Sequence, residues 1–243
     1  MGHGLLPCPF YLFMPRFSHL IFDLDGTLVD SKADLAAATN LMLESLGLRP
    51  LSLEQITSYV GDGARVLVAR ALGPERVHLV PQGFAIFMEY YQTHLLDRTR
   101  PYDGIAEFLT AAHGEGIILS VLTNKPEVPS RTILEGVHLA HFFHAVIGGD
   151  TLPVRKPDPQ GVFHLQQLTQ AASEATLLIG DSRIDVETGR AAGVLTCGVT
   201  WGFGTEGLLA TSPEFVVNST EDLQRLVLDE EGQKTTKKVK RQE

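Results

Sequence analysis

The chain has 243 residues, of which 44% are hydrophobic and 20% are charged, proportions typical of a folded globular protein. Its formal net charge is −9 and its isoelectric point is near 5.5. Because a nucleic-acid-binding surface needs a concentration of basic residues, we expect no nucleic-acid partner. Only two cysteines occur, Cys8 and Cys197, which argues against a disulfide framework or a zinc site and favours reduced thiols in the cytoplasm.

The two ends of the sequence differ from the rest of the chain. Residues 5–13 are apolar, but the run is short, contains two prolines and lacks a basic segment before it, so it is typical neither of a membrane span nor of a signal peptide. We predict an N-terminal extension at residues 1–16, with Met14 as a candidate natural start. No other segment approaches the length of a membrane span, and we expect no membrane partner. Residues 229–243 are rich in lysine without apolar periodicity, which predicts a basic, solvated tail.

The first strong signal is an apolar run at residues 20–22, typical of a buried parallel strand. Asp23 and Asp25 follow at its carboxyl end, where open α/β sheets place their active sites. Gly26 then allows a sharp turn, and Thr27 adds a hydroxyl beside the acids. Two carboxylates this close repel each other unless a cation joins them, so the pattern favours phosphate chemistry in which one Asp attacks, the other handles a proton and Mg²⁺ holds both. A solvated turn is the alternative, because Asp-Gly is common in turns.

Residues 31–99 carry helical patterns and no strand signal. Helices are predicted over residues 32–46, from Ser52 onward, over residues 62–72 and over residues 84–95. The sequence therefore predicts a separate all-helical cap at residues 31–100.

From residue 101 onward, strand and helix signals alternate. Strands are predicted at residues 117–123, 145–147, 177–180, 196–199 and 215–217. Helices are predicted at residues 105–113, 128–136, 159–170, 185–192 and 220–228. Such alternation implies a parallel sheet with right-handed crossovers, and hence an α/β core made from residues 17–30 and 101–228.

Polar side chains follow the second predicted strand and recur in a later loop. Thr123 and Asn124 offer a hydroxyl and an amide that can hydrogen-bond phosphoryl oxygens, although the same residue types also cap helices. Lys156 lies in a loop stiffened by two prolines, where a fixed ammonium could offset the charge of a phosphate; a solvated surface lysine is the alternative.

A further pair of acids follows the strand at residues 177–180. Asp181 ends that strand and Asp185 lies four residues later. Carboxylate oxygens from two strand ends suit Mg²⁺, which takes few carboxylates and keeps several waters. A helix cap with an acid in the first turn is the alternative.

Taken in order, these signals resemble the four motifs of the haloacid dehalogenase superfamily, whose phosphohydrolases use an aspartate nucleophile. The run from Asp23 to Thr27 is similar to the first motif, Thr123 to the second, Lys156 to the third, and the run from Gly180 to Asp185 to the fourth. The resemblance covers residues 17–228 and is strongest to phosphoglycolate phosphatases. It implies a Rossmann-like parallel sheet with a helical cap inserted after the first strand. Ile184 departs from the pattern, because those relatives usually carry asparagine there, so a nearby amide is missing.

The resemblance implies Mg²⁺-dependent hydrolysis of a small phosphate monoester through an aspartyl-phosphate. Asp23 would attack phosphorus, and Asp25 would protonate the leaving oxygen and later deprotonate water. Thr123, Asn124 and Lys156 would hold the phosphoryl oxygens, and Gly26 and Thr27 would contact the substrate. Asp23, the backbone carbonyl of Asp25 and Asp181 would hold the metal, whereas Asp185 would orient Lys156 or a water on the metal.

Substrate choice is expected to lie in the cap, because the core motifs serve any phosphate ester. Arg65 follows a glycine turn at residues 60–63 and stands at the start of a predicted helix, a place that can bind an anion such as a carboxylate. A plain turn with a solvated arginine is the alternative.

Three rival functions stay open. A sugar phosphomutase would share the core but return the phosphate to its substrate. A dehalogenase would share the fold but has no use for Asp25 or Mg²⁺. A binding or regulatory protein could retain the core without catalysis, although all four motif positions are chemically competent. Phosphoglycolate is favoured as the substrate by resemblance, and the enzyme is expected to be a cytoplasmic monomer or homodimer.

Overall fold

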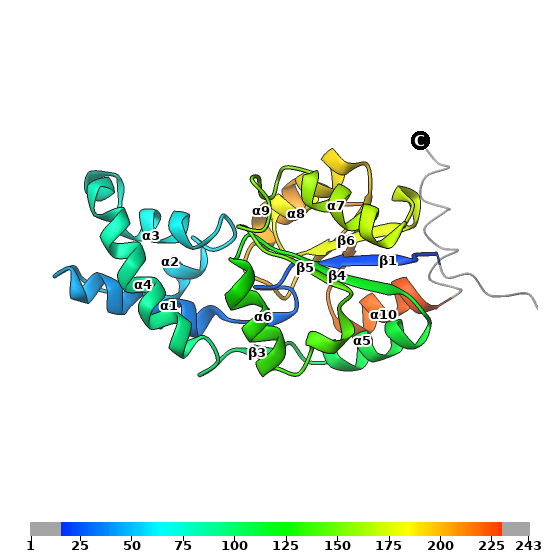
Figure 1. The fold of residues 1–243 in the computed structure, drawn as a ribbon, viewed down its shortest axis with the longest axis horizontal. Coiled ribbons are helices and arrows are strands. Elements are labelled where there is room, and N and C mark those ends of the chain that lie inside the picture. Colours follow the sequence, from blue (N-terminus) through cyan, green and yellow to red (C-terminus); the bar gives the residue numbers. More distant parts are fainter. Residues whose placement is uncertain (1–15, 230–243) are drawn as a thin grey trace, which may run out of the picture.

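The computed structural model describes residues 16–229, so the predicted N-terminal extension and basic tail lie almost entirely outside the described residues. Figure 1 shows two parts side by side, a bundle of helices and a sheet flanked by helices. The bundle is inserted in the sequence after the first strand of the sheet. The predicted α/β core with an inserted helical cap is therefore confirmed. Within residues 16–229, none of the helices combines the length and apolar character that crossing a bilayer requires.

The core is a six-stranded parallel sheet in the order β5-β4-β1-β6-β7-β8. Its strands are His19–Phe22 (β1), Ile118–Leu122 (β4), Ala145–Ile147 (β5), Thr176–Gly180 (β6), Leu195–Val199 (β7) and Phe215–Val217 (β8). The central strand β1 pairs with β4 on one side and with β6 on the other. The strand order therefore reverses at β1, and ligands of such sheets bind outside the carboxyl ends of the strands at this point.

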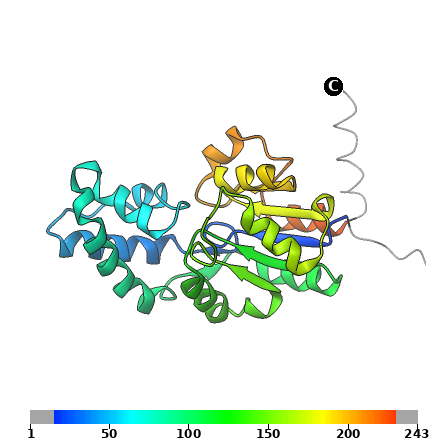
Figure 2. The ribbon, with the colours of Figure 1, turned by 45° about the horizontal axis from the view of Figure 1, so that its top comes forward.

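Helices cover both faces of the sheet, as Figure 1 and Figure 2 show. One face carries α5 (Ile105–Gly114), α6 (Glu127–Gly136) and α10 (Thr220–Leu228), and the other carries α7 (Gln160–Thr169) and α8 (Arg183–Ala192). The alternation along β1 explains this arrangement. Phe22 belongs to the larger apolar cluster, which includes residues of α5 and α10, whereas Ile21 packs in a second cluster with Leu165 of α7 and Ala192 of α8. Both faces of β1 are thereby removed from water, as in other parallel sheets.

The cap is built from α1 (Lys32–Ser45), α2 (Leu53–Thr57), α3 (Ala64–Leu72), the 3₁₀ helix η1 (Pro74–Leu79) and α4 (Val80–His94). The long helices α1 and α4 pack along each other. Ser52 begins α2 with a capping box, in which its hydroxyl accepts from the backbone N–H of Gln55 and the Gln55 side chain accepts from the backbone N–H of Ser52.

The starts of α3 and α4 differ from the prediction by two or more residues, both at residues with special backbones. α4 begins at Val80 rather than at residue 84, because Pro81 occupies the first turn, where its missing N–H costs no hydrogen bond. A Cβ added at Gly83 would lie 3.2 Å from Met42 and 3.3 Å from Leu72, so the bare glycine lets α4 approach its neighbours closely. α3 begins at Ala64 rather than at residue 62, because Gly63 has a φ of 91°.

A short two-stranded ribbon, not predicted from the sequence, joins the cap to the core. Its strands are Val29–Asp30 (β2) and Arg100–Pro101 (β3), which pair in antiparallel fashion. Two residues are too few to show the alternation that identifies a strand. The buried carboxylate of Asp34 strengthens the same junction, since it accepts hydrogen bonds from the backbone N–H of Thr99 at 2.8 Å and from the Thr99 hydroxyl at 2.7 Å. The chain therefore enters and leaves the cap at one place.

Candidate active site

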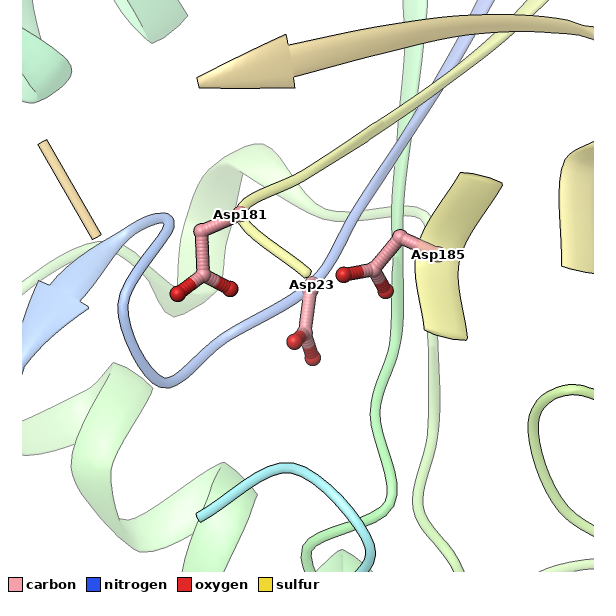
Figure 3. Close-up of side chains that lie close together, drawn as sticks. All are labelled: Asp23, Asp181 and Asp185. Atoms are coloured by element: carbon pink, nitrogen blue, oxygen red, sulfur yellow. The ribbon is translucent and has the colours of Figure 1, made fainter. Parts of the chain in front are cut away.

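The candidate site lies at the carboxyl ends of the three central strands. Asp23 directly follows β1, and Asp181 directly follows its neighbour β6. Thr123 follows β4, on the other side of β1. Figure 3 shows the side chains of Asp23 and Asp181 close to that of Asp185, which comes from the first turn of α8. The sheet topology thus gathers acids that are far apart in the sequence.

Lys156 is the cation of this cluster. Its ammonium is buried and lies 3.0 Å from Oδ1 of Asp23 and 2.6 Å from Oδ1 of Asp185. Burial alone would lower the pKa of Lys156, but the two carboxylates raise it above its ordinary value, so the side chain is a permanent cation. The second oxygen of Asp185 accepts hydrogen bonds from the backbone N–H and the hydroxyl of Ser182, at 3.1 and 2.6 Å. Both oxygens of Asp185 are therefore engaged by the protein itself.

The arrangement of the other two acids fits a divalent metal ion. Oxygens of Asp23, Asp181 and Asp185 lie within 4.8 Å of one another, and all three residues are buried. Burial raises the pKa of Asp23 to about 6 and that of Asp181 to about 8, so at neutral pH a bound cation would favour the ionised form of Asp181 above all. Oδ2 of Asp181 accepts from the backbone N–H groups of Phe203 at 2.6 Å and Gly204 at 3.3 Å, which leaves Oδ1 for a metal. Asp23 and Asp181 are the direct ligands that this geometry allows, and few carboxylates suit Mg²⁺.

Glycines make room for these carboxylates. Gly26 has a φ of 84°, and a Cβ placed there would lie 2.3 Å from Oδ2 of Asp181. A Cβ at Gly202 would lie 2.2 Å from Cβ of the same aspartate. The adjoining Thr27 is buried, its hydroxyl has no hydrogen-bond partner, and its carbonyl accepts from Nε1 of Trp201 at 3.2 Å. Gly26 therefore has a steric role beside Asp181, and Thr27 keeps an unused hydroxyl.

The carboxylate of Asp25 pairs with a lysine that was not among the predicted site residues. Nζ of Lys125 lies 2.8 and 3.1 Å from the two carboxylate oxygens of Asp25. The Ser31 hydroxyl donates to the same carboxylate at 2.5 Å. Lys125 directly follows Thr123 and Asn124 at the end of β4, and this position next to the second motif is the only sequence signal that could have drawn attention to it.

The two polar residues at the end of β4 have different surroundings. Thr123 is buried and lines the cavity described below, and its Oγ1 accepts from the backbone N–H of Lys125 at 3.3 Å. The Asn124 side-chain amide donates to the carbonyl of Gly61 in the cap at 2.9 Å and to the carbonyl of Lys156 at 3.0 Å. Asn124 thus ties a cap loop to the lysine-bearing loop, while its own Oδ1 has no partner.

A cavity of about 50 Å³ lies between the core acids and the cap. Among the core residues that line it are Asp23, Asp25, Thr123, Lys125 and Asp181. The cap contributes mainly apolar side chains, namely Leu35, Val60, Ala64, Leu67, Phe87, Met88 and Tyr91. The cavity is therefore charged at its floor and apolar under the cap.

Two other residues singled out in the sequence are Arg65, on the cap helix α3, and Ile184, on the core helix α8. Arg65 is exposed, is absent from the cavity lining, and has its guanidinium carbon 4.7 Å from the centre of the Phe84 ring. Ile184 is buried, and its Cδ1 lies 3.6 Å from the place of a Cβ on Gly61. The side chain that replaces the usual asparagine therefore packs against the cap loop instead of forming a polar contact with it.

Comparison with known proteins agrees with this geometry. The family described as haloacid dehalogenase-like hydrolase matches residues 20–199. The phosphoglycolate phosphatase of Neisseria meningitidis is 41% identical over 211 residues, which cover 83% of this chain and 90% of that protein. The phosphoglycolate phosphatase of Pseudomonas putida is 40% identical over 218 residues, covering 86% and 79%. A solved structure of a predicted phosphoglycolate phosphatase from Haemophilus somnus has a TM-score of 0.83 at 30% identity, covering 88% of this chain and 99% of that one. The chain belongs to the haloacid dehalogenase-like hydrolases.

Proposed function

We propose that this hydrolase is a Mg²⁺-dependent phosphatase that converts 2-phosphoglycolate to glycolate and phosphate through an aspartyl-phosphate. The observation that carries the proposal is the buried carboxylate of Asp23, held 3.0 Å from the Lys156 ammonium beside Asp181 and two residues ahead of Asp25. The choice of substrate is supported by the names of relatives that are about 40% identical to this chain.

Asp23 is the proposed nucleophile. Its pKa of about 6 leaves it largely ionised at neutral pH, although burial removes most of the water that would otherwise solvate the carboxylate. An oxygen of Asp23 attacks phosphorus, the bond to the ester oxygen breaks, and glycolate leaves. Water then attacks phosphorus of the aspartyl-phosphate and releases phosphate and free Asp23.

Asp25 is the proposed acid and base. In the first step it gives a proton to the departing ester oxygen, and in the second it takes a proton from the attacking water. Its contacts with Ser31 and Lys125 fix the direction of the carboxylate. An acid held in place in this way loses little freedom when it reaches the reacting oxygen.

The oxygens of the transferring phosphoryl group need donors and positive charge. Lys156 provides an ammonium beside the Asp23 carboxylate, and Thr123 provides a hydroxyl at the cavity that Asp23 also lines. The unpaired Thr27 hydroxyl is a further donor after the Gly26 turn. The Asn124 amide holds the loop that carries Lys156, so its contribution is to keep the ammonium in place.

The metal would be held by the carboxylates of Asp23 and Asp181 and by the backbone carbonyl of Asp25, with Asp185 remaining on Lys156. When bound, Mg²⁺ supplies positive charge that reduces the repulsion between the phosphate and the Asp23 carboxylate.

A phosphatase screen tests the proposal directly. Purified protein is incubated with phosphoglycolate, hexose phosphates and other small esters, with Mg²⁺ or with excess chelator, and free phosphate is measured. We expect release from phosphoglycolate that vanishes with the chelator and returns with Mg²⁺. Isomerisation of a hexose phosphate without release would favour a phosphomutase, and the absence of turnover on every ester would favour a binding protein.

The same proposal describes a cytoplasmic enzyme that acts as a monomer or homodimer. Light scattering during size-exclusion chromatography, at the concentration used in the assay, measures the oligomeric state.

A further inference from the structure

Lys125 brings a positive charge into the substrate cavity. Among the described residues that line the cavity, it alone is a lysine, arginine or histidine. Its side chain is only 5% exposed, so the charge is shielded from bulk water. A buried ammonium interacts more strongly with an anion than an exposed one does, because water screens it less.

The surroundings of Lys125 connect the core with the cap. On one side, Nζ lies 2.8 Å from Asp25. On the other, it lies 4.8 Å from the centre of the Tyr91 ring, on the cap helix α4. The Tyr91 hydroxyl is buried and interacts with the Lys125 ammonium, which can only donate, so the Tyr91 O–H itself has no acceptor among the described residues. A cation and an unused donor therefore meet at the wall of the cavity, next to the proposed acid.

The chemistry of the substrate places a second anion at this wall. In the phosphate ester of a 2-hydroxy acid, the carboxyl carbon is two bonds from the ester oxygen. When Asp25 gives its proton to that oxygen, the carboxylate must lie beside Asp25. Once its proton has been transferred, Asp25 is itself a carboxylate. Two neighbouring carboxylates repel each other unless a cation lies between them, and Lys125 already contacts one of the two positions.

We propose that Lys125 is a substrate-binding residue that receives the carboxylate of a 2-hydroxy acid phosphate, with the Tyr91 hydroxyl as a second donor. The inference rests on the proposed function for the position of the ester bond. The carboxylate is then recognised mainly by the core of the protein, where Lys125 lies close to Thr123 after the same strand. The cap contributes the Tyr91 hydroxyl.

A pair of ligands that cannot be hydrolysed tests the inference on the wild-type protein. In 3-phosphonopropanoate, a methylene replaces the ester oxygen of phosphoglycolate, and propylphosphonate differs from it by a methyl in place of the carboxylate. Both are titrated by calorimetry in the presence of Mg²⁺. We expect 3-phosphonopropanoate to bind about 10- to 100-fold more tightly, the usual size of a charge-assisted hydrogen bond. Equal affinities would overturn the inference.

Variants assign that preference to Lys125. Lys125→Gln should bring the two affinities to within about threefold of each other, whereas Lys125→Arg should keep most of the preference, because it keeps the charge. Lys32→Gln is the matched control, since Lys32 is a half-exposed lysine outside the cavity. Circular dichroism verifies that each variant is folded. If Lys125→Gln does not fold, the comparison of the two phosphonates on the wild-type protein still tests whether the carboxylate is recognised.

Turnover separates recognition from a mere effect on Asp25. If Lys125 binds the carboxylate, Lys125→Gln should lower kcat/KM for phosphoglycolate at least tenfold more than for ethyl phosphate. Equal losses on both esters, with an unchanged ratio of phosphonate affinities, would show that Lys125 only positions Asp25 and would overturn the inference. Wild-type protein that prefers 3-phosphonopropanoate but does not hydrolyse phosphoglycolate would contradict the proposed substrate and leave carboxylate recognition supported.

Discussion

The ammonium of Lys156 lies 3.0 Å from Oδ1 of Asp23. This contact links the proposed nucleophile to a cation from a distant loop, and Asp185 holds the same ammonium from the opposite side at 2.6 Å. The Lys156 charge, which is shared with Asp185, therefore offsets part of the cost of burying the Asp23 carboxylate before any substrate enters. Burial still raises the pKa of Asp23, and Lys156 limits that rise.

Replacing Asp23 with asparagine should abolish turnover without unfolding the protein. The amide cannot attack phosphorus, so we expect kcat to fall by about 10⁴-fold or more. Lys156 keeps its contact with Asp185, so the fold should persist. The checks are the rate of phosphate release and the thermal melting curve. Activity within tenfold of wild type would rule out Asp23 as the nucleophile.

Replacing Asp25 with asparagine should separate the two halves of the reaction. An activated ester such as p-nitrophenyl phosphate needs no proton on its leaving group, so phosphoryl-enzyme should still form. Hydrolysis of phosphoglycolate should fall by about 10²- to 10⁴-fold, the usual contribution of general acid–base catalysis. Acid quenching followed by mass spectrometry of the intact protein detects the phosphoryl group. Failure of the phosphoryl-enzyme to form from p-nitrophenyl phosphate would argue against a role confined to proton transfer.

Mg²⁺ should bind more tightly as the pH rises from about 6 to about 8. The folded carboxyl groups of Asp23 and Asp181 have pKa values of about 6 and about 8, against an ordinary value of 3.8, so the metal must displace protons below these values. The metal-free folded state also holds protons more tightly than the unfolded chain. Its stability should therefore fall as the pH rises from about 4 toward 8, and added Mg²⁺ should offset this loss. Calorimetric titrations with Mg²⁺ at several pH values, with Asp181→Ala as the weak-binding control, measure the affinity for the metal. An affinity that does not change with pH would contradict the prediction.

Gly26→Ala should displace Asp181. The new Cβ would lie 2.3 Å from Oδ2 of Asp181, at a backbone φ of 84° that also strains any side chain. Gly47→Ala is the matched control, because Gly47 has a φ of 71° but nothing within 4 Å of its added Cβ. We expect both variants to lose about 1–2 kcal/mol of unfolding free energy, and Gly26→Ala alone to weaken Mg²⁺ binding by at least about tenfold. Chemical denaturation and Mg²⁺ titration measure the two effects, and similar Mg²⁺ affinities in both variants would contradict a steric role.

Arg65→Ala distinguishes two roles for a residue that the sequence analysis predicted to bind the substrate's carboxylate. The guanidinium stacks on Phe84 at the surface of the cap, outside the cavity lining. The structure therefore favours a role in cap packing, for which we expect a loss of about 0.5–1 kcal/mol in unfolding free energy and equal small changes in kcat/KM on phosphoglycolate and p-nitrophenyl phosphate. A loss of about 1.5–3 kcal/mol of transition-state binding on phosphoglycolate alone would instead support recognition by Arg65.

The elements that carry the chemistry were predictable because their signals are local. β1, β4 and β6 are short, mainly apolar runs, and Asp23 and Asp181 stand directly after two of them. The pairing of Lys125 with Asp25 was not predictable, because it joins residues 100 positions apart and depends on the register of β1 and β4. The same holds for Asn124, whose amide reaches Gly61 of the cap only after the two parts have packed. Local patterns therefore locate strand ends and acids, whereas the partners of each side chain depend on the assembled fold.

The ribbon formed by Val29–Asp30 and Arg100–Pro101 makes the inserted helices exchangeable. Main-chain pairing holds the two ends of the cap next to each other. Another segment whose own ends are adjacent could therefore replace the cap without changing the path of the chain in the core. A tight turn in that place would join β2 and β3 as a simple hairpin. Because Asp23 and Asp181 directly follow strands of the core that such an exchange does not touch, the ancestry of the cap and that of the reaction can diverge. Proteins that share this chemistry need not share the structure that covers it.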